Sequence, residues 1–179
     1  MPAIQNISLS NQKLPSIFLK PSEVYISKRP TAVTTVLGSC IAITMFNRES
    51  HIAAICHAVM PICHQILKCD LSCKERYKYV NCVIPMMCSV YRRNNVLLKD
   101  IEVKLFGGSE MFGIRRLNPA TRPSIGAVNV ETARQLLEEE GLRIKVSHVG
   151  GFYGRKIIFF THTGDVYLKR IRDKALIRT

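Results

Sequence analysis

Hydrophobic positions in the first third of the chain occur in short β-branched runs of the kind that form strands. Five such runs, separated by turn-forming residues, predict strands at 16–20, 23–28, 31–37, 40–46 and 51–60. The polar sequence NRES between the last two is typical of a turn. The pattern therefore predicts a meander of short strands.

Two later segments follow the period of an amphipathic helix. Between residues 76 and 94 hydrophobic residues recur at spacings of three and four, with Pro85 inside the pattern. An interior proline predicts either a kink or a helix that begins later than the pattern suggests. A second helix is expected to have Asn129 as its N-cap and to end before Gly141, which suits the left-handed position after a helix.

Four further strands are expected at 100–107, 142–149, 155–161 and 165–171. Strands outnumber helices and come in groups, which favours an α+β fold over a doubly wound one. We expect mixed or antiparallel β-sheets packed together, with two main flanking helices. A length of 179 residues suits one domain, so we expect a flexible leader over 1–14 and a single domain over 15–179.

The chain is strongly basic, with 26 Lys and Arg against 13 Asp and Glu and a formal net charge of +13. Such a charge favours acidic partners, whether nucleic acid, anionic lipid or an acidic protein surface. The basic residues occur in pairs without an RNA-binding motif, so we expect no nucleic-acid partner. No segment has the roughly 18 apolar residues of a membrane span, and no export signal is recognisable. We expect a cytoplasmic protein without membrane insertion.

Seven cysteines, an odd number, predict reduced thiols rather than a disulfide framework. Cys40 stands where two predicted strands meet, directly after Gly38 and Ser39. Small residues at such a junction leave backbone N–H groups open to a ligand oxygen. A thiol beside such donors can attack a carbonyl while they stabilise the developing oxyanion. The alternative is that Cys40 is a small hydrophobic residue of the core.

His57 lies on the next predicted strand after Cys40. An antiparallel pairing of 40–46 with 51–60 would bring the two residues to the same level. An imidazole beside a thiol favours the reactive thiolate and can later protonate a leaving amine. The alternative for His57 is a packed histidine whose ring is satisfied by a backbone carbonyl.

Five stretches of the sequence together resemble the CheD family of chemoreceptor glutamine deamidases: LGSC, CHAVMP, GGSEMF, IGAVNV and GGFYGRKIIFFTHTG. The resemblance covers about residue 15 to residue 171. It implies a cysteine hydrolase with a fold similar to that of deamidating bacterial toxins. Such an enzyme would convert glutamines on the cytoplasmic helices of chemoreceptors to glutamate, releasing ammonia, without a metal or organic cofactor. The resemblance also implies binding to CheC-type phosphatases.

The same resemblance assigns roles to individual residues. The nucleophile falls on Cys40, the catalytic histidine on His57, and a threonine that orients this histidine on Thr34. Backbone N–H groups near Gly38 and Ser39 would stabilise the tetrahedral oxyanion. Away from these positions, the chain departs from the residues that are common in the family at Asn81, Val128 and His148, which bears on partner choice more than on the reaction.

Two alternatives stay open. The fold could act as a non-catalytic adaptor that binds receptors or phosphatases, although a binding module has no need of a thiol and imidazole pair. A zinc site could also form from Cys63, His64, Cys69 and Cys73, although this spacing lacks a CxxC pair. The remaining cysteines, Cys56, Cys82 and Cys88, fall in strand or helix patterns and are expected in the core.

Overall fold

The computed structural model describes residues 14–64, 73, 75–110 and 123–171. Its strands are β1 (Ser16–Phe18), β2 (Val24–Ser27), β3 (Ala32–Leu37), β4 (Ile41–Phe46), β5 (Ala53–Ala58), β6 (Glu102–Gly107), β7 (Ile144–Val149), β8 (Gly154–Phe160) and β9 (Val166–Ile171). Its helices are α1 (Val80–Arg93), the short 3₁₀ helix η2 (Leu98–Asp100) and α2 (Ile125–Glu139). The predicted leader falls almost entirely on residues 1–13, which lie outside the described residues.

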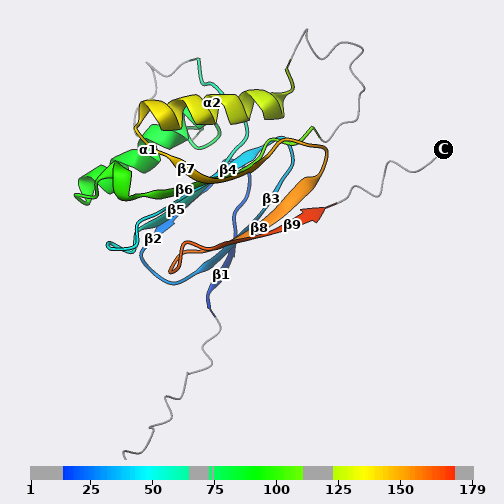
Figure 1. Ribbon diagram of the computed structural model, residues 1–179. Helices are drawn as coiled ribbons and strands as arrows, with labels where there is room; N and C mark the ends of the chain where they lie inside the picture. Colours follow the sequence, from blue (N-terminus) through cyan, green and yellow to red (C-terminus); the bar gives the residue numbers. More distant parts are fainter. Residues whose placement is uncertain (1–13, 65–72, 74, 111–122, 172–179) are drawn as a thin grey trace, which may run out of the picture.

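These elements form three layers, with the two α-helices over one face of a central sheet and a second sheet on its other face (Figure 1). The central sheet has the strand order β2-β5-β4-β6-β7, and the outer sheet has the order β1-β3-β8-β9. Both sheets are mixed, because β1 runs parallel to β3 and β7 runs parallel to β6. The predicted α+β fold with two flanking helices is confirmed.

The predicted meander is wrong, because the strands from β1 to β4 alternate between the two sheets. Among the first five strands, only β4 and β5 pair with a direct sequence neighbour, as an antiparallel hairpin. The strand β3 belongs to the outer sheet, where it pairs with β1 and β8. The alternation of side chains predicts that a segment is a strand, but it does not say which sheet the strand joins.

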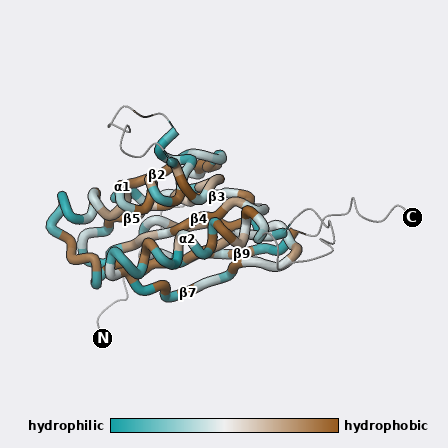
Figure 2. The backbone as a smooth tube through the Cα atoms, turned by 90° about the horizontal axis from the view of Figure 1, so that it is seen from above, coloured by the Kyte–Doolittle hydropathy of each residue, from teal (hydrophilic) through white to brown (hydrophobic). Residues whose placement is uncertain are grey.

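The central strands β4 and β5 are buried along their whole length because both of their faces are covered. On β4, Ile41 and Ile43 pack toward the helices, while Ala42 and Phe46 pack toward the outer sheet. Each helix contributes a hydrophobic stripe to the first of these two cores, and Figure 2 shows apolar and polar residues alternating along the helices. No described helix is long and apolar enough to cross a lipid bilayer.

The first helix begins at Val80, later than the hydrophobic pattern suggests, and Pro85 lies inside it on the exposed side.

The second helix has Ser124 as its N-cap, whose hydroxyl accepts from the Ala127 N–H at 3.1 Å. The prediction of Asn129 as N-cap is therefore wrong, since Asn129 lies inside the helix and is buried.

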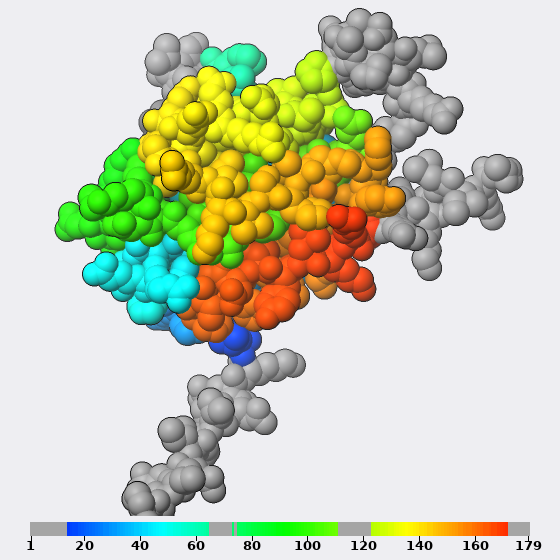
Figure 3. Space-filling view, viewed as in Figure 1, coloured from blue at the N-terminus to red at the C-terminus, as the bar shows by residue number. Residues whose placement is uncertain are grey.

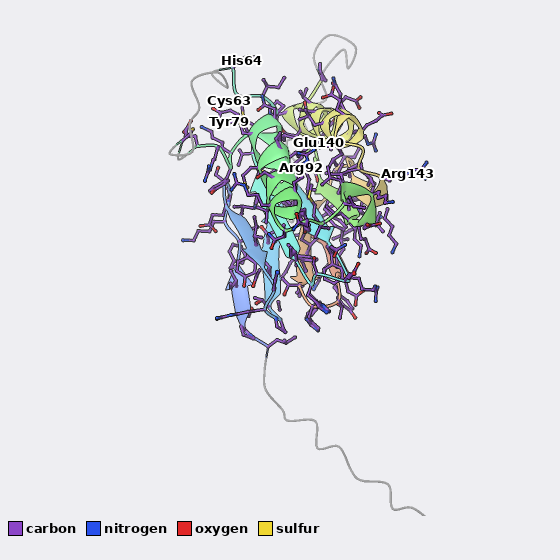
Figure 4. The ribbon with its side chains drawn as sticks, turned by 90° about the vertical axis from the view of Figure 1, so that its left-hand side faces the viewer. Cys63, His64, Tyr79, Arg92, Glu140 and Arg143 are labelled. Atoms are coloured by element: carbon purple, nitrogen blue, oxygen red, sulfur yellow. The ribbon has the colours of Figure 1, made fainter. Side chains whose placement is uncertain are left out.

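The C-terminal ends of the two helices lie close together. Gly141 follows α2 with φ of 75°, which confirms the left-handed position predicted there. Arg92 near the end of α1 forms an ion pair with Glu140, the C-cap residue of α2 (Figure 4).

Candidate active site

The turn that carries Cys40 leads the chain from the outer sheet into the central sheet. Its three carbonyl groups are all held from one side: Gly38 O accepts from Ser109 N at 2.7 Å, Ser39 O from Asn129 Nδ2 at 3.1 Å, and Cys40 O from Gly108 N at 2.8 Å. The Asn129 amide also donates to Val59 O at 3.0 Å. The buried asparagine thus ties the turn to the end of β5, a role that the sequence analysis missed.

Holding the carbonyls also orients the N–H groups of the turn. Within one peptide unit the C=O and N–H groups point in opposite directions, so the N–H groups of Ser39 and Cys40 point away from Ser109 and Asn129. No backbone hydrogen bond within the described part of the chain uses the N–H of Gly38, Ser39 or Cys40. The turn therefore presents donors beside the thiol, which is the arrangement that an oxyanion needs.

A close backbone contact packs α2 against Gly108, whose N–H holds the Cys40 carbonyl. A Cβ atom on Gly126, in the first turn of α2, would lie 2.7 Å from the backbone C and O atoms of Gly108. A side chain at this helix position would force the helix away from the segment that holds Cys40 O. The glycines of the GGSEMF and IGAVNV stretches therefore have a packing reason to be small.

His57 lies on β5 and is buried, with 2% of its surface exposed. Its Nδ1 is 2.8 Å from Thr35 Oγ1, and the same hydroxyl donates to Leu19 O at 2.8 Å. A hydroxyl has one proton, and the Leu19 carbonyl can only accept, so Thr35 must accept the hydrogen bond from Nδ1–H. This places the proton of neutral His57 on Nδ1 and leaves Nε2 as the basic nitrogen.

The register of the central sheet brings His57 and Cys40 to one face. Ala42 lies directly opposite His57, and Cys40 precedes Ala42 by two residues, so its side chain falls on the same face. Diagonal neighbours of this kind are about 7–8 Å apart between Cα atoms, within reach of an imidazole. Cys40 is half-buried and packs against the core between the two sheets. The expected antiparallel pairing is present, but it places His57 opposite Ala42 rather than at the level of Cys40, so the two residues are diagonal neighbours.

The resting pair consists of neutral groups. Burial raises the pKa of the Cys40 thiol, with its own backbone N–H acting in the opposite direction. Burial lowers the pKa of His57, opposed by the Leu19 carbonyl and the charge of Glu23. His57 Nε2 is buried without a hydrogen-bond partner among the described residues, so its lone pair is available to take a proton. The thiolate must then form as the thiol attacks.

Thr34, the threonine assigned to this histidine by resemblance, does not contact it. Side chains alternate along β3, so Thr34 faces away from the central sheet while Thr35 faces toward it and is buried. The hydroxyl bonded to His57 therefore belongs to Thr35. The buried neighbours Val33 and Leu37, which share the face of Thr35, are the signal that could have identified it.

The other cysteines divide into two groups. Cys56 and Cys88 lie in the core as predicted, and burial raises the pKa of each to about 12. Cys82 is only partly buried, so its placement in the core is wrong, and burial together with Cys63 raises its pKa to about 11.

The proposed zinc ligands are only partly described. Cys63 and His64 lie near Tyr79 at the start of α1 (Figure 4), but Cys69 falls outside the described residues. Within the described ranges, no three His, Cys, Asp or Glu side chains are grouped as a metal site would require.

Comparison with known proteins gives one consistent family. Residues 68–170 match the model of the CheD family, described as CheD chemotactic sensory transduction. The chain is 44% identical over 159 residues, 89% of its length and 92% of the relative, to the "Probable chemoreceptor glutamine deamidase CheD 2" of Geobacter sulfurreducens. It is 37% identical over 155 residues, 87% of its length and 91% of the relative, to the "Probable chemoreceptor glutamine deamidase CheD" of Maridesulfovibrio salexigens.

Proposed function

The chain belongs to the CheD family, and we infer that it deamidates glutamine side chains of chemoreceptors, with Cys40 as nucleophile and His57 as base. The observation that carries these two roles is the hydrogen bond from His57 Nδ1 to Thr35 Oγ1. It fixes the tautomer in which Nε2 is basic, on the sheet face that Cys40 shares. Thr35 is then a positioning residue.

In the first half of the reaction, the thiol of Cys40 adds to the carboxamide carbon of the substrate glutamine. His57 Nε2 takes the thiol proton as the C–S bond forms, because the raised pKa of Cys40 keeps the thiol protonated beforehand. The N–H groups of Ser39 and Cys40 donate to the tetrahedral oxyanion. His57 then returns the proton to the amide nitrogen, the C–N bond breaks, and ammonia leaves a thioester on Cys40.

In the second half, water is the only co-reactant. His57 takes a proton from the water as its oxygen adds to the thioester carbon, and the same N–H groups stabilise the second oxyanion. The C–S bond breaks, the proton passes to the departing sulfur, and the product is a glutamate side chain. The neutral thiol and imidazole are restored.

The test uses the purified full-length chain with a receptor cytoplasmic fragment. Ammonia release and peptide mass spectrometry report the conversion of individual glutamines. Cys40→Ala and His57→Ala are expected to abolish conversion, whereas Cys82→Ala, which removes a partly buried thiol elsewhere, is expected to retain it. Conversion that survives Cys40→Ala would exclude the proposed nucleophile. Binding of the fragment by the unmodified chain without conversion of any glutamine would favour the adaptor.

The partners follow from the same proposal. The cytoplasmic helices of chemoreceptors are the proposed substrate, and the net charge of +13 favours acidic surfaces on them. A CheC-type phosphatase stays a prediction from the family resemblance. Competition between such a phosphatase and the receptor fragment in the deamidation assay would support it.

A further inference from the structure

A pocket of about 460 Å³ lies where the edge strand of the central sheet meets the outer sheet. Figure 3 shows the segments of α2, β7 and β9 meeting on one face of the molecule. The pocket is lined by Arg134 of α2, His148 of β7, Arg155 of β8, Arg170 of β9 and neighbouring small residues. No Asp or Glu is among its lining residues in the described part of the chain, and its volume falls in the range of about 300–1,000 Å³ typical of small-ligand sites.

Arg155 is buried, and none of the ion pairs in the described part of the chain includes it. Its guanidinium donates to His148 Nδ1 at 2.8 Å and to Tyr153 O at 3.1 Å, and it also donates to Ser109 Oγ and Gly150 O. These neutral groups accept the hydrogen bonds of the guanidinium but do not balance its positive charge. A buried cation without a counter-ion is unfavourable unless a bound anion supplies the missing charge.

Arg170 adds a second positive charge beside the first. It lies directly opposite Arg155 in the antiparallel register of β8 and β9, so the two side chains share a face. Like charges in directly opposed positions destabilise a sheet. No Asp or Glu among the described lining residues offsets this repulsion, which again points to an anion from outside the chain.

His148 shows where an acceptor is missing. Its Nδ1 accepts from Arg155 Nε, so in the neutral ring the proton must be on Nε2. Burial and the charges of Arg155 and Arg170 lower the pKa of His148, which keeps the ring neutral. Its Nε2 lies 3.2 Å from Arg170 Nη2, and both of these atoms are then donors. Two donors that face each other are unfavourable, and an acceptor within reach of both would relieve this contact.

We propose that this pocket binds a phosphate group, as free phosphate or as a phosphate monoester, held by Arg155, Arg170 and the Nε2–H of His148. Guanidinium groups match the oxygens of phosphate in pairs, and a phosphate dianion balances two arginines where a carboxylate balances one. Arg134 on the rim adds a third positive charge. This binding function goes beyond glutamine deamidation, although Arg155 also contacts Ser109, which holds the Cys40 turn.

Calorimetric titration of the full-length chain tests the proposal, with inorganic phosphate, O-phosphoserine and acetate at constant ionic strength. We expect saturable binding of at least one phosphate ligand and weaker binding of acetate. Arg170→Gln is expected to weaken phosphate binding about tenfold or more, because it removes a charge-assisted contact. The matched control is Arg143→Gln, which removes the same charge from an exposed residue outside the pocket (Figure 4).

A second variant supplies the negative charge from the protein itself. His148→Asp would place a carboxylate between the two arginines, so phosphate binding should be lost while the midpoint of urea unfolding rises. Tighter binding of O-phosphoserine than of inorganic phosphate would identify a monoester ligand, and equal or tighter inorganic phosphate would identify the free anion. Absence of saturable phosphate binding would overturn the proposal, as would equal losses in Arg170→Gln and Arg143→Gln or acetate binding as tight as phosphate.

Discussion

Thr35 and His57 belong to different sheets, and the 2.8 Å hydrogen bond between Oγ1 and Nδ1 joins them across the core. The histidine alone would have two tautomers, only one of which leaves Nε2 basic. The hydroxyl selects that tautomer because its own proton is committed to Leu19 O. The outer sheet therefore controls the chemistry of a residue in the central sheet.

Replacing Thr35 by valine keeps the shape of the side chain and removes the hydroxyl that selects the tautomer of His57. Nδ1–H of His57 would lose its hydroxyl acceptor, at a cost of about 1–3 kcal/mol. We expect kcat/KM for receptor deamidation to fall roughly 5- to 150-fold, if that cost appears in the transition state. Steady-state ammonia release measures it.

Thr34→Val is the matched control, because it makes the same chemical change one residue away on the outward face of β3. We expect deamidation close to that of the unmodified chain. A larger loss in Thr34→Val than in Thr35→Val would contradict the assignment of the positioning residue to Thr35.

The pH dependence of kcat/KM should report the pKa of His57, which acts as a base only in its neutral form. Because His57 acts in its deprotonated form and its pKa is lowered, activity is present at pH 7 and is lost as pH falls below about 6.5 through that lowered pKa. The loss is expected at a lower pH than for an ordinary histidine. An acidic limb centred above pH 7 would contradict this environment for His57.

Alkylation of Cys40 by iodoacetamide provides an independent probe of the thiol. Only the thiolate reacts, and the pKa of Cys40 is raised, so the labelling rate at Cys40 should keep rising between pH 7 and about 9. Peptide mass spectrometry can follow this site separately from the other cysteines. A rate that is already constant at pH 7 would indicate a preformed thiolate and imidazolium pair instead.

Asn129→Ala should weaken both the fold and the site. The substitution leaves the part-buried carbonyls of Ser39 and Val59 without their donor, and each lost hydrogen bond costs about 0.5–1.5 kcal/mol. Urea unfolding is expected to show the lower stability, and deamidation should fall because the Cys40 turn loses an anchor. Gln135→Ala, on the exposed side of the same helix, should leave stability within about 0.5 kcal/mol of the original.

Gly126→Ala and Gly141→Ala separate crowding from backbone strain. At Gly126 the added methyl group meets backbone atoms of Gly108, so helix α2 must shift, and both stability and deamidation should fall. At Gly141 no described atom lies within 4 Å of the added group, and only the left-handed backbone is strained, by about 1–2 kcal/mol. Gly141→Ala should therefore lower the unfolding midpoint and leave kcat unchanged.

The parts of the fold that depend on neighbouring residues could be predicted from the sequence. The hairpin of β4 and β5 is local, and its antiparallel pairing followed from the turn-forming residues between the two strands. The left-handed residue after α2 followed from Gly141. The N-cap was missed because Ser124 and Asn129 are both good capping residues, and only the packing of α2 on the Cys40 turn decides between them.

The rest of the site depends on contacts between distant segments. Thr35 and His57 meet because β3 and β5 lie in different sheets that pack together, which no local pattern specifies. The arrangement of His148, Arg155 and Arg170 likewise requires the edges of both sheets to come together. The proposed reacting pair followed from the sequence, while the hydroxyl that contacts His57 needed the tertiary structure.

The division of the site between two sheets also determines when the enzyme can become active during folding. Thr35 is positioned by β3, whose register is set by pairing with β8, where Ile157 lies opposite it. The contact that orients His57 therefore exists only when both sheets are formed and packed together. A chain that lacks the outer sheet would lack the hydroxyl that selects the tautomer of this histidine.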